Sequence, residues 1–203
     1  KPMASDIIER IRKLQAGISV PDDAVPAPHR PEMLFIGCID ARLDINIEIG
    51  IPYGKALIYR NVAALVSGTR GDDDPEHVGE AAALEFAVNV MNIKDIVVMG
   101  HTDCGGINAC LHGVPKARHV MQYLSPLNEI RNEVTSQAGN LLQIARKMEQ
   151  AAVRQSVANL MTYDAVAHKV ATGELTLHGW VINTANRRIS EMDLATGVFQ
   201  PMR

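Results

Sequence analysis

The segment GCIDAR, residues 37–42, brings together three side chains that are costly to bury. Cys38, Asp40 and Arg42 occupy alternate positions, directly after the apolar run 33–36. A thiol, a carboxylate and a guanidinium each need a partner when they leave water. Alternate residues of an extended chain point to the same side, so the Arg42 guanidinium can bind the Asp40 carboxylate. The Cys38 thiol is then left without a partner, which indicates a cation.

The segment MGHTDCGG, residues 99–106, supplies the remaining ligands that such a cation needs. His101 and Cys104 also follow directly on an apolar run. Ligands of parallel α/β sheets gather outside the carboxyl ends of the strands, so two neighbouring strands would bring Cys38 and this pair to one edge. Two thiolates and an imidazole suit zinc, and three protein ligands leave a fourth position open, as in catalytic sites. The sequence therefore predicts one catalytic Zn²⁺ per chain.

The fourth position of this zinc site has two candidate occupants, water and the Asp40 carboxylate. Zinc bound by two thiolates and a neutral imidazole has no net charge, yet it can lower the pKa of bound water from about 15.7 towards 7. That chemistry yields a hydroxide nucleophile at neutral pH. Asp40 lies close enough along an extended backbone to reach the same position. The sequence leaves open which of the two occupies it.

The third cysteine, Cys110, permits a rival arrangement in which a Cys₃His site is closed and structural. Cys110 follows Cys104 by six residues on an expected helix, and this offset turns the two side chains apart. We therefore expect Cys110 to pack in the core. Asp103, between two ligands, is expected either to accept a hydrogen bond near the site or to face water. Three cysteines are too few for a disulfide framework, which favours a reducing, cytoplasmic compartment.

The elements that must position these residues are typical of an α/β fold with a central, mostly parallel β-sheet flanked by helices. Short apolar runs predict strands over 33–38, 56–59 and 96–99, and the Ala-rich segment 78–91 predicts a helix between the last two. This order is that of a parallel sheet with right-handed crossovers. The later segments predict helices over 117–172, a strand over 174–182 and a closing hairpin around 195–197.

The N-terminal residues predict an arm rather than a packed layer. A helix is expected to run to about residue 15, and four prolines follow between positions 21 and 31. We therefore divide the chain into an N-terminal helix and Pro-rich arm, 1–31, and a zinc-binding α/β catalytic domain, 32–203. The chain has 203 residues, 47% of them hydrophobic, and a net charge of −3, which give no sign of a nucleic-acid or membrane partner.

The two chemical motifs together resemble those of the β-class carbonic anhydrases. The motifs are Cys-x-Asp-x-Arg at 38–42 and His-x-x-Cys-Gly-Gly at 101–106. The similarity extends through four further segments, YRNVAALV (59–66), AALEFAV (82–88), IVVMGH (96–101) and LHGW (177–180). It covers nearly the whole chain from about residue 30, and the order and spacing of the segments are more specific than either motif alone.

The resemblance implies a zinc lyase that reversibly hydrates carbon dioxide to bicarbonate and a proton. It implies Cys38, His101 and Cys104 as metal ligands, with Asp40 either accepting a hydrogen bond from zinc-bound water or displacing that water. Arg42 would hold Asp40 away from the metal. Members of the family form dimers, often paired into tetramers, whose N-terminal helices wrap the partner. A homodimer or tetramer is therefore expected, and the Pro-rich arm suits that role.

Two departures from the family pattern keep alternative functions open. His29 stands where plant-type members have Gln, and Ala64 stands where Asn is usual. A pocket altered at these positions would suit a hydrolase of carbonyl sulfide or carbon disulfide on the same scaffold. A catalytically silent zinc-binding homologue is the third hypothesis. The intact Asp40–Arg42 pair argues against it, because structural zinc does not require that pair.

Overall fold

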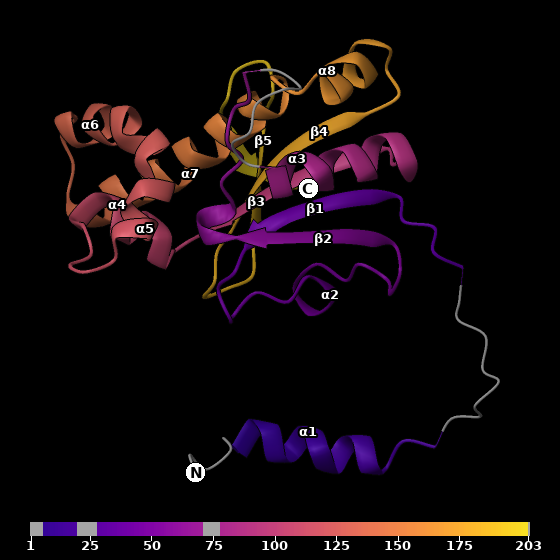
Figure 1. The fold of residues 1–203 in the computed structure, drawn as a ribbon. Coiled ribbons are helices and arrows are strands. Elements are labelled where there is room, and N and C mark those ends of the chain that lie inside the picture. Colours follow the sequence, from indigo (N-terminus) through magenta and orange to yellow (C-terminus); the bar gives the residue numbers. More distant parts are fainter. Residues whose placement is uncertain (1–5, 20–27, 71–77, 203) are drawn as a thin grey trace.

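The computed structural model describes residues 6–19, 28–70 and 78–202. Within these ranges the strands form one six-stranded sheet in the order β2-β1-β3-β4-β5-β6 (Figure 1). The strands are β1 (Met33–Cys38), β2 (Ala56–Asn61), β3 (Asp95–His101), β4 (Thr176–Ile182), β5 (Ile189–Met192) and β6 (Phe199–Pro201). Strands β1 to β4 pair in parallel, whereas β5 and β6 are added antiparallel. The predicted α/β fold with a mostly parallel sheet is confirmed.

The helices lie between and beside the strands (Figure 1). They are α1 (Asp6–Ala16), α2 (Ile45–Glu48), α3 (Val78–Glu85), α4 (Gly105–His112), α5 (Arg118–Tyr123), α6 (Asn128–Ser136), α7 (Leu141–Leu160) and α8 (Asp164–Ala171). Two short segments of the described residues are 3₁₀ helices, η1 (Val62–Ala64) and η3 (Ser125–Leu127), and one is a π-helix, η2 (Phe86–Val90). No helix in the described part of the chain combines the length and apolar character that crossing a bilayer requires.

Both faces of the sheet are covered by helices, which explains the apolar character of its central strands. Along β3, Ile96 and Val98 pack with residues of α3, α7 and α8. Val97 and Met99 point to the opposite face and pack with residues of α4, α6 and α7. Because β3 is buried on both sides, it lacks the alternation of a half-exposed strand. The predicted helix 78–91 corresponds to α3 and its wider continuation η2.

The N-terminal helix α1 lies apart from the rest of the chain in Figure 1. It confirms the predicted helix, and all of its residues are exposed. Most of the Pro-rich segment, including Pro21 and Pro26, lies outside the described residues. The division into an arm, 1–31, and a catalytic domain, 32–203, therefore stays a prediction.

The loop Leu65–Ser67 is buried although it belongs to no helix or strand. A buried backbone must find hydrogen-bond partners for its N–H and C=O groups. Side chains supply all of them: Asn61 binds both groups of Leu65, Ser156 and Asn159 bind Val66, and Glu80 and Tyr163 bind Ser67. Most of these partners come from α3, α7 and the residues after α7. They therefore tie the loop to the helical layer.

Replacement of Ser156 by alanine tests this anchoring. Ser156 is fully buried, and its hydroxyl accepts the Val66 N–H at 3.0 Å. The Ser156→Ala variant leaves that N–H without a partner, so we expect the free energy of unfolding to fall by about 1–3 kcal/mol. Urea denaturation measures this loss. Ser136→Ala removes an exposed hydroxyl that binds its own helix and should change stability by less than about 0.5 kcal/mol. Equal effects of the two substitutions would contradict the anchoring.

Candidate metal centre

The parallel pairing of β1 with β3 brings two of the sequence-predicted ligands to one edge of the sheet. Cys38 is the last residue of β1 and His101 the last of β3, and Gly37 pairs with Met99 in the register between them. Cys104 follows three residues later, directly before the first turn of α4. One potential ligand atom from each of Cys38, His101 and Cys104 lies within 4.8 Å of the other two. All three residues are buried.

The geometry of these three residues fits a tetrahedral zinc ion. The sulfurs of Cys38 and Cys104 are 3.9 Å apart. Two sulfurs bound at 2.3 Å to a tetrahedral zinc would be separated by about 3.8 Å. The His101 Nδ1 lies 3.0 Å from the main-chain oxygen of Thr102, which leaves Nε2 for a metal. That Nε2 is buried and has no hydrogen-bond partner, as expected of a nitrogen that binds a cation.

The two thiols change each other's pKa through their contact. The hydrogen bond from Cys104 holds the pKa of Cys38 well below its ordinary value, and His101 and nearby main-chain N–H groups act in the same direction. The same contact with Cys38, together with burial, raises the pKa of Cys104. The two sulfurs thus share a proton in one hydrogen bond, in which either can be the donor. A dication in this place would displace that proton, because coordinated thiols are deprotonated.

Arg42 binds the Asp40 carboxylate with both sides of its guanidinium fork. Its Nε donates to Oδ1 at 2.9 Å and its Nη2 to Oδ2 at 2.7 Å, while the Arg42 main-chain N–H adds a third bond. These bonds hold the pKa of the Asp40 carboxyl well below its usual range. The Asp40 Oδ2 is 3.9 Å from His101 Nε2, so the carboxylate lies beside the three candidate ligands rather than among them.

Arg60 fixes the backbone on which Cys38 and Asp40 stand. Its Nε donates to the Cys38 carbonyl at 2.8 Å, and its Nη2 donates to the Asp40 carbonyl at 2.7 Å. Arg60 lies on β2, the strand next to β1. The Arg60 guanidinium thus fixes the backbone at the last residue of β1 and again just beyond it. It thereby sets the direction of the Cys38 and Asp40 side chains.

A tight turn beside the site brings α4 close to the strand ends. Ala63 and Ala64 both adopt left-handed backbone conformations, with φ of 66° and 53°. Such conformations cost non-glycine residues about 1–2 kcal/mol each. A Cβ on Gly106 would come within 2.8 Å of the Val62 side chain and 3.0 Å of the Ala63 Cβ. Glycine at position 106 therefore permits the close approach of this turn to the first turn of α4.

The remaining sequence-predicted positions lie outside the ligand group. Cys110 is buried in the apolar cluster around α4 and is absent from the one candidate metal-binding group of the described residues. The rival closed Cys₃His site is therefore not formed. His29 is exposed, whereas Ala64 is buried in the turn described above.

Sequence reasoning missed the side chains that hold the loop between His101 and Cys104. The Thr184 main-chain N–H donates to the Thr102 hydroxyl at 3.0 Å, and Glu149 accepts the main-chain N–H of Asp103 at 2.7 Å. Each contact joins residues at least 46 positions apart. No local sequence signal indicates either contact, because each depends on how distant elements pack.

Comparison with known proteins shows similarity to carbonic anhydrases along most of the chain. The family model described as carbonic anhydrase matches residues 33–189. The carbonic anhydrase of Pseudomonas aeruginosa is 32% identical over 176 residues, which span 83% of this chain and 76% of that protein. The mitochondrial β carbonic anhydrase 6 of Arabidopsis thaliana is 29% identical, and the match spans 85% of this chain and 60% of that protein.

Solved structures resemble the chain in the same way. One of the tetrameric β-carbonic anhydrases of the ascomycete Sordaria macrospora aligns with a TM-score of 0.72 and 25% identity. The alignment covers 94% of this chain and 87% of that one. The similarity therefore extends over the sheet and the helices on both of its faces.

Metal analysis of two cysteine variants distinguishes the open site from a closed one. Wild-type protein and Cys110→Ser are expected to retain about one zinc ion per chain after dialysis. Cys104→Ser is expected to lose the metal, because only Cys38 and His101 remain as strong ligands. Atomic emission spectrometry measures the zinc content. Loss of zinc from Cys110→Ser, or full retention by Cys104→Ser, would contradict the assignment.

Proposed function

This chain belongs to the β-class carbonic anhydrases, and we propose that Cys38, His101 and Cys104 hold the zinc ion for its reversible hydration of carbon dioxide. The family, the enzyme class and the zinc cofactor expected from the sequence are confirmed by the family match. The observation that supports the three ligands is the buried His101 Nε2, which lacks a hydrogen-bond partner next to two neighbouring thiols.

Bound zinc supplies a Lewis acid that lowers the pKa of water from about 15.7 towards 7. In the reaction, the water oxygen forms a bond to the carbon of carbon dioxide, an electron pair of one C=O bond moves onto its oxygen, and one proton leaves to give bicarbonate. Asp40 is held ionised by Arg42, so it acts as a hydrogen-bond acceptor. We assign it the role of orienting the reacting water, while Arg42 keeps its carboxylate away from the fourth ligand position.

Hydrolysis of carbonyl sulfide or carbon disulfide is not favoured, because the relatives that match the chain are carbonic anhydrases. A catalytically silent homologue is not favoured either, since the Asp40–Arg42 pair is formed with both of its hydrogen bonds. Turnover of carbon dioxide and of carbonyl sulfide by the same zinc-loaded sample compares the two enzymes directly. A sample that holds one zinc ion per chain and hydrates no carbon dioxide would refute the proposal.

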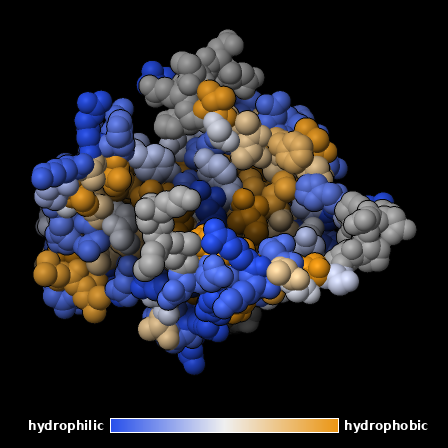
Figure 2. Space-filling view, turned by 60° about the horizontal axis from the view of Figure 1, so that its bottom comes forward, coloured by the Kyte–Doolittle hydropathy of each residue, from blue (hydrophilic) through white to orange (hydrophobic). Residues whose placement is uncertain are grey.

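The assembly is proposed to be a homodimer or a tetramer. The related enzyme of Sordaria macrospora is tetrameric. Here α1 exposes Ile7, Ile11 and Leu14, with 67%, 47% and 65% of their surfaces accessible. Hydrophobic side chains also gather in the hollow beside this helix in Figure 2. Surfaces of this kind are typical of protein interfaces, and the arm 1–31 would wrap the partner subunit.

The substrate partners proposed for the site are carbon dioxide and bicarbonate. The net charge of −3 offers no basic surface for nucleic acid. A cytoplasmic location is proposed because all three cysteines are free thiols, which a reducing compartment preserves.

Replacement of Asp40 by alanine tests the role assigned to its carboxylate. The Asp40→Ala variant should keep its zinc, since three ligands remain, and its kcat/KM for hydration should fall by about 100-fold or more. Stopped-flow hydration assays and metal analysis measure the two quantities. Glu174→Ala, which removes an exposed carboxylate bound to Lys169, serves as the control. Wild-type turnover in Asp40→Ala would show that the role is wrong.

Substitution on α1 tests the assembly. Leu14→Glu places a charge on the exposed apolar side of the helix, so we expect a smaller particle mass than that of the wild type. Lys13→Glu reverses the charge at the neighbouring polar position, which is a larger change in charge than that of Leu14→Glu. It should leave the particle mass unchanged. Sedimentation velocity measures the mass. An identical mass for Leu14→Glu and wild type would exclude α1 from the interface.

A further inference from the structure

Asp103 lies between two candidate ligands in the sequence. Its main-chain N–H, its carbonyl and its carboxylate each form a hydrogen bond with another side chain. Its main-chain N–H donates to Glu149 Oε1 at 2.7 Å, and its carbonyl accepts from Arg42 Nη2 at 3.0 Å. Its carboxylate accepts from Arg146 Nη2 at 3.0 Å. The residue has a φ of 58°, in the left-handed region that non-glycine residues rarely adopt. The contacts therefore maintain a conformation that the chain does not favour by itself.

Glu149 and Arg146 form one unit on α7. They are three residues apart, and Arg146 Nη1 donates to both carboxylate oxygens of Glu149, at 2.8 and 3.0 Å. The Glu149 side chain is 2% exposed. Burial raises the pKa of Glu149, and the hydrogen bonds from Arg146 oppose that effect. A buried carboxylate is costly unless it is paired, and here Arg146 and the Asp103 main-chain N–H supply the partners.

Arg42 connects this unit to Asp40. Its Nη2 donates both to Asp40 Oδ2, at 2.7 Å, and to the Asp103 carbonyl, at 3.0 Å. The Arg42 side chain is 53% exposed, so packing does not fix its position. The Asp103 carbonyl is therefore the second anchor that sets the direction of the guanidinium, and the Asp103 peptide is in turn fixed by Glu149.

We propose that Glu149 and Arg146 are positioning residues for the reaction, which hold the Asp103 peptide so that its carbonyl anchors Arg42 and thereby keeps Asp40 off the metal. The inference rests on the proposed function for its activity test only. Without the anchor, the Asp103 peptide is free to rotate and the Arg42 guanidinium loses one of its three acceptor atoms. The Asp40 carboxylate, 3.9 Å from His101 Nε2, then lies near enough to enter the fourth ligand position.

Two variants weaken the anchor by breaking the pairing of Glu149 with Arg146 in different ways. Glu149→Gln keeps the shape of the side chain but removes the charge that Arg146 binds, and Arg146→Met removes the guanidinium from a side chain that is 32% exposed. The second variant keeps the test valid if the first fails to fold. We expect kcat to fall by about tenfold in both, with KM changed less than about twofold, because the defect is in orientation.

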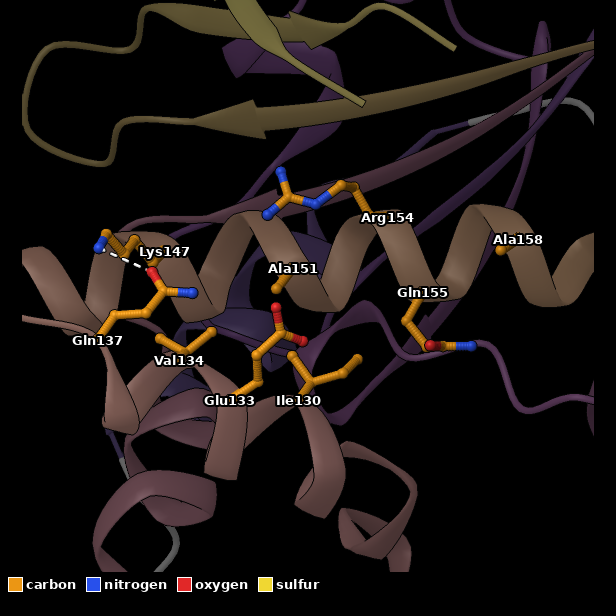
Figure 3. A pocket seen from close by; sticks show the side chains of 9 residues that line it. All are labelled: Ile130, Glu133, Val134, Gln137, Lys147, Ala151, Arg154, Gln155 and Ala158. Atoms are coloured by element: carbon orange, nitrogen blue, oxygen red, sulfur yellow. Dashed lines mark hydrogen bonds between the residues drawn. The ribbon is translucent and has the colours of Figure 1, made fainter. Parts of the chain in front are cut away.

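Arg154→Met is the matched control. Arg154 lies further along α7, in a groove of about 470 Å³ between α6 and α7 (Figure 3). Its Nη1 donates to the Gly197 carbonyl at 3.1 Å, so this variant also removes a helix guanidinium that binds another part of the chain. We expect its kcat to equal that of the wild type within about twofold. A loss equal to that of Arg146→Met would attribute the effect to the helix and overturn the proposal.

A double-variant comparison separates positioning from general support. If Glu149 acts through Arg42, then Glu149→Gln should lower kcat by less than about twofold when Arg42 is already alanine. The same tenfold loss in both backgrounds would overturn the proposal. Protein loaded with cobalt in place of zinc provides a readout that needs no turnover. Its visible absorption bands should change on Glu149→Gln in the wild-type background, because the metal environment changes.

The cobalt spectra also distinguish the two hypotheses. In the Arg42→Ala background, Glu149→Gln should leave the bands unchanged, and in the Arg154→Met control they should match the wild type. If the absorption bands do not change on Glu149→Gln in the wild-type background, the positioning role is overturned, whatever the activity. A wild-type protein that hydrates no carbon dioxide, but whose cobalt bands respond as expected, would refute the proposed function and leave the positioning role supported.

Discussion

The parallel pairing of β1 with β3 is the interaction on which the candidate metal centre depends. Metal ligands from distant parts of a chain can converge only if the backbone segments that carry them end at the same level. The register between these strands places Cys38 and His101 at one edge, and the turn into α4 adds Cys104. Close packing on both faces makes this register costly to shift, since a slip would place side chains of one size in sites filled by side chains of another.

The sequence predicted the sheet, and the grouping of Cys38, His101 and Cys104 at one of its edges, for local reasons. β1 and β3 are continuous apolar runs, and the ligand-type residues follow each run directly, so both signals lie within a few residues. The alternate spacing of Asp40 and Arg42 likewise predicted the hydrogen-bonded pair that the structure shows. These features could be predicted because neighbours in sequence are also neighbours in space.

The supports of the site could not be predicted in this way. Glu149 binds the Asp103 main-chain N–H, and Thr184 binds Thr102, across contacts that depend on how whole elements pack. The left-handed conformations of Ala63 and Ala64 could not be predicted either, because alanine disfavours them. Strain and long-range hydrogen bonds are thus found around the candidate metal centre, where local sequence rules are weakest.

The buried loop Leu65–Ser67 has a consequence for the dynamics of the molecule. Its amide hydrogens bind side-chain oxygens of Asn61, Ser156 and Glu80, so two of the three are released only when α7 or α3 withdraws. Hydrogen exchange at Val66 and Ser67 would then be as slow as in the central strands, despite the absence of regular structure. A segment that looks like a flexible connection in a ribbon drawing would belong to the last cooperative unit to open.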